Sequence, residues 1–308
     1  MRALVVGCGY VGLALGAELA KRGHEVVGLR RTAASQSELK AAGIRLLLAD
    51  ITKPEYLAKC DPAYDWVANC VASSGGGPEE YRAVYLQGTR NLLAWLSAAP
   101  PKKFVYTSST SVYAQTDGSV VTETSPAEPA VETAKTLLET ERVLLAAAHG
   151  SSFPAVILRV AGIYGPGRGH WLKQYLKGEA TIEGAGDRVL NMIHRDDVVG
   201  AILAALDRGR PGEIYNAVDD EPVRQRDLFQ WLAGRLRRPL PVSSPVEENA
   251  SSKRGLTSKR VSNDKIKVEL GHRFKHPTFR EGLEAELGSF LTTEHPERRS
   301  RNQRDRWF

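Results

Sequence analysis

The sequence has little of what marks a membrane, secreted or metal-binding protein. Its 308 residues contain only 3 cysteines, Cys8, Cys60 and Cys70, an odd number without CxxC spacing, which argues against a disulfide framework and a zinc site. No apolar run approaches the roughly eighteen residues of a membrane span. The first such run, Ala3 to Val6, is also too short for a secretory signal. We therefore expect a cytoplasmic protein without membrane association and without a metal site.

What is present is the composition of a large globular protein. Hydrophobic residues make up 42% and charged residues 25%, enough for a sizeable core. Of the net charge of +6, the segment from Arg298 to Phe308 contributes +4, from five Arg and one Asp. We interpret residues 294–308 as a basic flexible tail. Nucleic-acid binding is disfavoured because no recognition element accompanies the tail.

Strand and helix patterns alternate through the first half of the chain, which predicts an α/β fold with a doubly wound parallel sheet. Beyond residue 161, glycine-rich turns and shorter elements predict a smaller C-terminal α/β lobe. The expected strands are Arg2–Val6, Glu25–Leu29, Arg45–Leu48, Trp66–Cys70, Phe104–Thr107 and Ala155–Val160, and the main expected helices are Tyr10–Arg22, Glu79–Ser97 and Glu132–Ala148.

A glycine-rich loop joins the first strand to the first helix. It reads Gly7-Cys8-Gly9-Tyr10-Val11-Gly12, the spacing that binds a dinucleotide in a Rossmann-type βαβ unit. Gly7 permits the tight turn, Gly9 lets a pyrophosphate approach, and Gly12 lets helix and sheet pack closely. The helix N-terminus adds N–H donors and a positive dipole end. This loop, with Tyr10 and Val11, predicts a nicotinamide cofactor site.

The end of the second strand indicates which cofactor is preferred. NAD-binding proteins place an acid there, whereas this sequence reads Arg30-Arg31-Thr32, which suits the 2′-phosphate of NADP(H). We therefore expect NADP(H) to be preferred, with NAD(H) still possible. Asp50 and Ile51 follow the third strand, where the adenine would bind. The other expected cofactor contacts are Cys70, Val71, Thr107 and Val160.

Three further segments carry a family resemblance. They are Phe104-Val105-Tyr106-Thr107-Ser108-Ser109-Thr110-Ser111-Val112-Tyr113, Leu158-Arg159-Val160-Ala161-Gly162-Ile163-Tyr164-Gly165-Pro166-Gly167 and Asn191-Met192-Ile193-His194-Arg195-Asp196-Asp197-Val198. With the glycine loop, they make the chain resemble the extended short-chain dehydrogenases/reductases, the nucleotide-sugar epimerase/dehydratase group. The resemblance runs from residue 1 to roughly 290.

The resemblance implies a domain organisation and a chemistry. Residues 1–160 would form an NAD(P)-binding Rossmann domain, and residues 161–293 mainly a substrate-binding lobe with elements returning to the first domain. Catalytic Ser, Tyr and Lys side chains would lie beside the nicotinamide, and Ser109 matches the family Ser. The substrate would be a nucleotide sugar or another small carbonyl compound. By analogy with the family, a homodimer would form through long helices such as Glu79–Ser97 and Glu132–Ala148.

The sequence departs from the family at Tyr-x-x-x-Lys. If Lys135 is the family Lys, the Tyr position holds Val131; in the later register the pair becomes Thr133 and Leu137. Neither register contains the Tyr, and Tyr85 stands where the family commonly has Asn. These departures resemble the atypical members, which keep the fold and lack the usual tetrad. Catalytic roles for Thr133 and Lys135 therefore remain open, Lys135 being either a cofactor ligand or a surface charge.

Several residues could complete the site. A replacement acid would come from Tyr113, Tyr164, His170 or Tyr175, and Tyr113 and Tyr164 are expected to line the substrate pocket. Arg188 and Arg254 are candidate anchors for an anionic substrate.

His194, just before Asp196 and Asp197, suggests an acid/base pair or a metal site. We favour a helix N-cap and a buried histidine. Two functions follow from the sequence: an NADP(H)-dependent oxidoreductase or epimerase/dehydratase-like enzyme, and alternatively a non-catalytic NADP(H)-binding sensor.

Overall fold

The computed structural model describes residues 1–73, 75, 77–245 and 257–293. Arg254 and the tail 294–308, for which the sequence made predictions, lie outside the described residues. Within the described ranges, none of the helices combines the length and the apolar character that crossing a bilayer requires.

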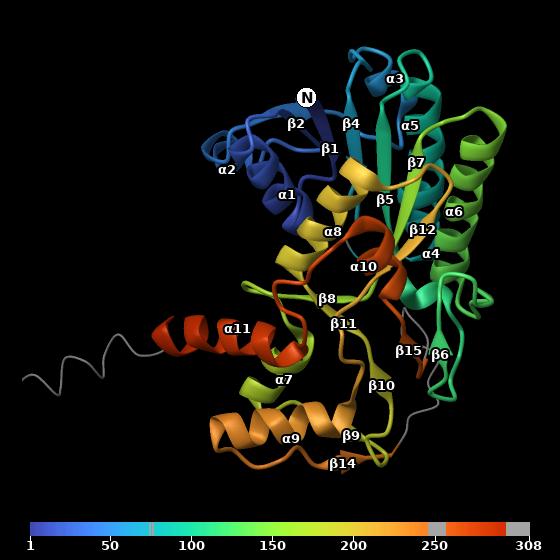
Figure 1. Cartoon of the computed structure of the whole chain (residues 1–308). Coiled ribbons are helices and arrows are strands. Elements are labelled where there is room, and N and C mark those ends of the chain that lie inside the picture. Colours follow the sequence, from blue (N-terminus) through green and yellow to red (C-terminus); the bar gives the residue numbers. More distant parts are fainter. Residues whose placement is uncertain (74, 76, 246–256, 294–308) are drawn as a thin grey trace, which may run out of the picture.

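A seven-stranded sheet forms the centre of the molecule (Figure 1), in the order β12-β7-β5-β4-β1-β2-β3, with every neighbouring pair parallel. The strands are β1 (Arg2–Val6), β2 (Glu25–Arg30), β3 (Ile44–Leu48), β4 (Trp66–Asn69), β5 (Lys103–Ser109), β7 (Ala155–Val160) and β12 (Ile214–Ala217). The buried interior strands β1 and β7 are rich in Val, Ile and Leu, as expected of a sheet covered on both faces. The predicted doubly wound α/β fold is confirmed.

Helices cover both faces of this sheet. Helix α8 packs on α1 and on β5 and β7, while α6 packs on β5 and β7 beside the helical segment that leads into α5. The helices of this part are α1 (Tyr10–Lys21), α2 (Gln36–Ala41), α3 (Pro54–Leu57), α4 (Pro78–Tyr81), α5 (Gly88–Leu96), α6 (Glu132–Gly150), α8 (Arg195–Arg208) and α10 (Asp264–Leu270).

The helix predicted over 79–97 is present as a continuous helical segment, but it is not α-helical throughout. A π-helical turn, η1 (Arg82–Gln87), separates α4 from α5. Within it Tyr85 is buried, its hydroxyl accepts a hydrogen bond from Ser73 N at 3.3 Å, and its ring lies 4.3 Å from that of Tyr81. Apolar periodicity cannot reveal such a turn, because one inserted residue leaves the pattern nearly unchanged.

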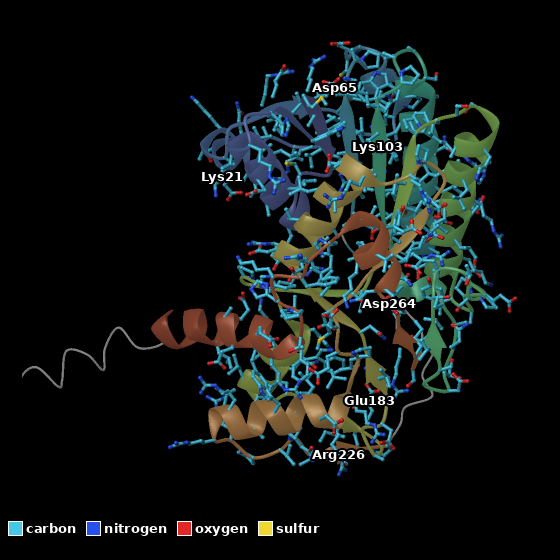
Figure 2. All side chains as sticks on the ribbon, in the orientation of Figure 1. Lys21, Asp65, Lys103, Glu183, Arg226 and Asp264 are labelled. Atoms are coloured by element: carbon cyan, nitrogen blue, oxygen red, sulfur yellow. The ribbon has the colours of Figure 1, made fainter. Side chains whose placement is uncertain are left out.

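Below the sheet in Figure 1, a smaller set of elements surrounds a second hydrophobic cluster, which includes Leu172, Phe229 and Phe279. Short strand pairs frame it, and Figure 2 shows Glu183 and Arg226 at its lower edge, far from Lys103 on the central sheet. Its elements are β8 (Gly162–Tyr164), α7 (His170–Lys177), β9 (Ile182–Glu183), β10 (Val189–Leu190), β11 (Met192–His194), β13 (Val223–Arg224), α9 (Gln225–Leu236), β14 (Ser243–Ser244) and α11 (Phe279–Thr293). A further pair, β6 (Val120–Val121) with β15 (Arg260–Val261), and a 3-10 turn, η2 (Thr110–Val112), complete the described elements.

Candidate functional site

A cavity of about 1200 Å³ follows the carboxyl ends of the central strands and continues along the second set of elements. This edge is where open parallel sheets bind ligands. From the sheet side, it is lined by Gly7, Cys8, Gly9, Tyr10, Val11, Arg30, Arg31, Thr32, Asp50, Ile51, Cys70, Val71, Thr107, Ser109 and Val160. Except for Gly12, the predicted cofactor residues therefore share one cavity.

The glycine loop is shaped for close approach. Gly7 has φ +80°, and a Cβ there would lie 2.7 Å from the backbone of Val71. A Cβ on Gly12 would lie 2.4 Å from Gly7 O, so Gly12 serves packing behind the loop. Gly9, in contrast, has open space where its side chain would be. Helix α1 begins directly after Gly9 with no side-chain cap and no acid in its first turn. The residues present therefore fit a dinucleotide pyrophosphate.

The residues predicted to contact the adenosine part of a cofactor lie at the ends of β2 and β3 and differ in exposure. Arg30 is half-buried, whereas Arg31 and Thr32 are exposed. Asp50 accepts two hydrogen bonds through Oδ1, from Thr52 N at 2.9 Å and from Thr52 Oγ1 at 2.8 Å. That carboxylate is thereby held in the turn after β3, while Arg30 at the end of β2 and Arg31 after it lie on the cavity wall.

Two thiols and a phenol line the cavity beside the glycine loop. Burial raises the pKa of Cys8 to about 11 and that of Cys70 to about 12, so both stay protonated at neutral pH. Burial likewise raises the pKa of Tyr10 to about 12. These groups therefore line the cavity as uncharged side chains and do not serve as nucleophiles.

Ser109 lies at the end of β5, half-buried on the cavity wall. Its Oγ accepts a hydrogen bond from Ser111 N at 3.2 Å, in the turn η2. Since the backbone occupies an acceptor position, the hydroxyl proton remains available for a ligand oxygen. Ser109 is therefore placed to polarise a carbonyl group.

Helix α6 presents an apolar residue to the cavity. Leu137 is its only residue on the described cavity wall, whereas Thr133 and Lys135 lie outside that wall. Lys135 is exposed and pairs with Glu132 at 2.7 Å. Neither predicted α6 residue therefore shares the cavity wall with Ser109.

Of the proposed replacement acids, Tyr164 and His170 line the cavity and two do not. Tyr113 is fully buried, and its hydroxyl donates to Asn216 Oδ1 at 2.8 Å, so its expected place in the substrate pocket is corrected. Tyr175 packs in the second hydrophobic cluster, with its hydroxyl 3.0 Å from Pro239 O. Both predictions were wrong because the residues that these hydroxyl groups contact are far away in the sequence.

A buried ion pair supports the floor of the site. Arg159 Nη2 lies 2.7 Å from Glu141 Oε2, and both side chains are almost fully buried. Ser108, the neighbour of Ser109, donates to Glu141 Oε1 at 2.5 Å. Glu141 raises the pKa of Arg159 against the effect of burial, which keeps the guanidinium charged. This pair ties α6 to β5 and β7.

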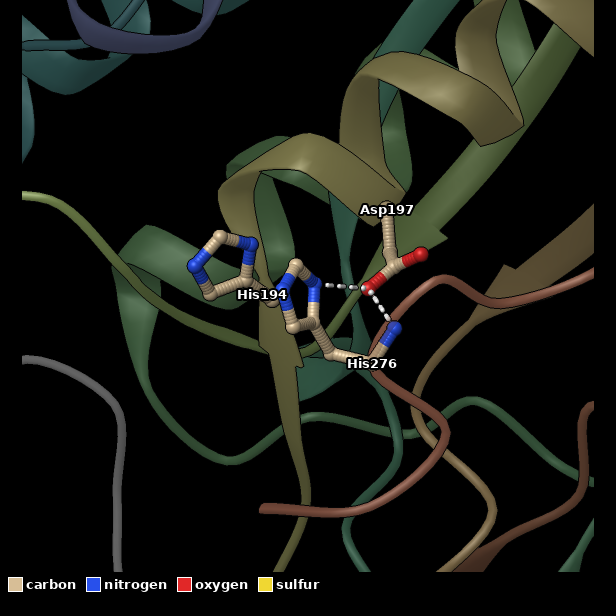
Figure 3. A group of neighbouring side chains, drawn as sticks. All are labelled: His194, Asp197 and His276. Carbon is tan, nitrogen blue, oxygen red and sulfur yellow. Dashed lines mark hydrogen bonds and ion pairs between the residues drawn. The ribbon is translucent and has the colours of Figure 1, made fainter. Parts of the chain in front are cut away.

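His194 is the N-cap of α8, as predicted: its Nδ1 accepts from Asp196 N at 3.2 Å. Its ring lies against that of His276, with centroids 3.9 Å apart and ring planes tilted by 41° (Figure 3), and burial lowers its pKa to about 4. Asp197 accepts hydrogen bonds from His276 N at 2.9 Å and His276 Nδ1 at 3.1 Å.

The three groups, His194, Asp197 and His276, lie close enough together to suggest a metal site. However, these atoms already have partners within the protein: His194 Nδ1 caps α8, and Asp197 Oδ2 accepts a hydrogen bond from His276 Nδ1. The cluster joins α8 to the segment before α11.

Sequence reasoning missed Lys259, which lies in the cavity wall although only 3% of it is exposed. Its Nζ donates to Tyr113 O at 2.9 Å and to Thr257 Oγ1 at 2.8 Å. Burial lowers the pKa of this amine to about 8. In the sequence, the adjacent cations Lys259 and Arg260 resemble an exposed charged segment. Only the short strand that includes Val261 indicates that this part of the chain is buried. Arg188, which the sequence offered as a candidate substrate anchor, lines the same cavity.

Comparisons with known proteins agree with this architecture. The model of the NAD dependent epimerase/dehydratase family matches residues 3–217. Protein YeeZ of Escherichia coli (strain K12) is 30% identical over 282 residues, covering 89% of this chain and 95% of its own. A 3-diazoavenalumate denitrifying reductase of Streptomyces sp is 27% identical, covering 92% and 99%. Among solved structures, the dTDP-glucose 4,6-dehydratase DesIV of Streptomyces venezuelae, determined with NAD bound, is 25% identical with a TM-score of 0.78, covering 92% and 94%.

Proposed function

The chain belongs to the NAD-dependent epimerase/dehydratase family and is an NAD(P)-dependent enzyme, and on that premise we propose that it is an NADP(H)-dependent oxidoreductase that reduces a small carbonyl compound. A nucleotide sugar is one such substrate. The observation that carries the proposal is the continuous cavity that joins the glycine loop and Arg30 to Ser109.

A one-way reduction suits this site better than epimerisation or dehydration. Those reactions remove a hydride from the substrate and later return it, so they need a group that both takes and gives a proton beside the nicotinamide. Helix α6 offers Leu137 to the cavity instead of a Tyr or Lys side chain. In addition, a relative that aligns with 92% of this chain is named as a reductase.

When bound, the reduced nicotinamide supplies the hydride. The Ser109 hydroxyl would donate to the carbonyl oxygen and stabilise the negative charge that develops on it. Leu137 adds apolar surface to the same wall. The proton that completes the alcohol would come from His170 on the cavity wall or from solvent through the opening.

Cofactor preference and turnover test the proposal together. NADPH and NADH are titrated into the protein by fluorescence, and oxidation of NADPH is then followed with a panel of aldehydes, ketones and nucleotide sugars. We expect NADPH to bind more tightly and at least one carbonyl class to be reduced. Replacing Ser109 with Ala should lower kcat by about 10²-fold with little change in NADPH affinity.

A double variant, Arg30→Asp with Arg31→Ala, addresses the 2′-phosphate. NADPH affinity should fall by about 10-fold or more while NADH affinity is retained, since only NADPH carries the phosphate. The matched control is Arg22→Ala, which removes an exposed guanidinium group that lies outside the cavity. An unchanged NADPH/NADH ratio in the double variant contradicts the preference for NADP(H).

The second candidate function is a non-catalytic NADP(H)-binding sensor. The observation in its favour is again Leu137 on the cavity wall, where catalysis in the family would need a polar side chain. Tight NADPH binding without oxidation by any member of the panel, and without an effect of Ser109→Ala, would favour this function.

A further inference from the structure

Lys259 is a buried cation whose charge the described protein does not neutralise. Its amine has two acceptors, the carbonyl oxygen of Tyr113 and the hydroxyl of Thr257, and both are neutral. No carboxylate among the described residues lies within ion-pair distance of it. An ammonium group carries three protons, so one donor remains after these two hydrogen bonds.

Such an arrangement is unfavourable unless something compensates it. Buried charges in proteins are ordinarily paired, because removing an ion from water costs several kcal/mol. The buried Arg159 follows this rule, because it faces Glu141. Lys259 does not, and it borders a cavity of about 1200 Å³ rather than the solid core.

The wall around Lys259 contains a second cation. Arg188 lies on the segment that enters β10, and the next residue, Val189, donates its N–H to Ser258 Oγ at 3.1 Å, so the two cation-bearing segments adjoin. Arg188 is oriented by Glu183, 3.2 Å from its Nη1, and by Trp171, whose ring centroid is 5.4 Å from its Cζ. Its Nε is buried and has no partner among the described residues. This leaves an unused donor on the same wall.

We propose that Lys259 is a specificity-determining residue that binds an anionic group of the substrate, a phosphate or a carboxylate, with Arg188 as its second contact. The inference rests on the proposed function, since it assigns a substrate class to the same cavity. Carbonyl compounds that carry phosphate or carboxylate would bind, and neutral analogues of the same shape would not. The substrate anion would complete the coordination of the amine that Tyr113 and Thr257 begin.

The test measures binding of small anions to the full chain saturated with NADPH, so that the glycine loop is occupied. Inorganic diphosphate and, separately, acetate are titrated by calorimetry at constant ionic strength. Replacement of Lys259 by Met should weaken anion binding at least about tenfold, because the main charge-assisted hydrogen bond is lost. Lys259→Arg, which keeps the charge, should stay within about threefold of the wild type. The stronger of the two probes identifies phosphate or carboxylate as the preferred group.

Two control variants separate binding from folding. Lys173→Met removes an exposed lysine that lines the same cavity, and should change the affinity by less than about twofold. Thr257→Val removes a neutral acceptor and leaves the amine, so anion affinity should be kept or rise. If Lys259→Met does not fold, Lys259→Arg and Thr257→Val provide the test instead. Loss of anion binding in Thr257→Val overturns the proposal. So does the absence of anion binding in the wild type. Unchanged affinity in a folded Lys259→Met overturns it as well.

The outcome is independent of the cofactor proposal. NADPH affinity of each variant is measured in the same preparation, and Lys259→Met should leave it unchanged, since Lys259 belongs to neither the glycine loop nor the strand ends beside it. If the wild type does not bind NADPH, the anion titration is repeated in Gly9→Glu, whose added carboxylate would repel anions from the glycine loop. Anion binding that still depends on Lys259 then supports the inference while the proposed function fails.

Discussion

Two buried cations contact Tyr113, and they differ in whether an anionic side chain neutralises them. Arg159 lies over the ring, with Cζ 4.8 Å from its centroid, and is paired with Glu141. Lys259 donates to the carbonyl oxygen of the same residue and has only neutral partners among the described residues. A charge that the fold neutralises itself is structural. A charge that it leaves uncompensated beside a cavity is available to a ligand.

The largest expected effect comes from removing the partner of Arg159. Glu141→Gln keeps the shape of the side chain and leaves the guanidinium buried without an anion. The free energy of unfolding should fall by about 3–5 kcal/mol. Denaturant titration measures it, with Glu139→Gln as the control, because the pairs of Glu139 with Arg82 and Arg90 are exposed and should contribute less than about 1 kcal/mol. Equal losses of stability in Glu141→Gln and Glu139→Gln would contradict the structural role of the buried ion pair.

A buried base that is kept neutral should make the protein acid-sensitive. The pKa of His194 is about 4 in the folded protein and about 6.5 in an unfolded chain, so the unfolded state binds more protons between these values. Stability is therefore full above pH 6.5 and falls as the pH is lowered toward 4, by at most about 3 kcal/mol.

The variant His194→Asn should flatten this dependence, since its amide oxygen can still cap Asp196 N. Urea unfolding at several pH values measures the slope. His149→Asn, at an exposed position, should leave the slope unchanged.

A buried acid without a cation gives a change of opposite sign. Asp219 is 1% exposed, its Oδ2 has no partner among the described residues, and burial raises its pKa well above the ordinary value. Its folded-state pKa is raised, so its contribution to stability is lost as pH rises through that value. Asp219→Asn, which retains an acceptor for Glu221 N, should raise the free energy of unfolding at pH 7 by about 1–2 kcal/mol. Thermal unfolding should show no such gain for Asp227→Asn, an exposed position.

The smallest effect on stability is expected at Lys259. Because no anion loses its partner, Lys259→Met should change the free energy of unfolding, in the absence of added anions, by less than about 1 kcal/mol. Denaturant titration beside Glu141→Gln tests this directly. A loss as large as that of Glu141→Gln would mean that Lys259 is a structural cation like Arg159.

Much of the fold followed from local pattern. The alternation of apolar strands and amphipathic helices predicted the parallel sheet, and the predicted strand Ala155–Val160 matches β7 residue for residue. The π-helical turn at Arg82–Gln87 was not predictable, because its Tyr85 is held by Ser73, twelve residues earlier. Local periodicity contains no information on such contacts.

The sequence by itself determined the glycine loop and the Arg30-Arg31 end of the cavity, because a βα unit contains its own turn, helix N-terminus and strand end within about thirty residues. Only the tertiary structure decided which polar side chains reach the cavity. Lys135, near the motif, turns out to solvent, whereas Lys259 reaches Tyr113 across 146 positions of the chain. Whether a charge is buried, and what it faces, depends on segments that meet only when the chain folds.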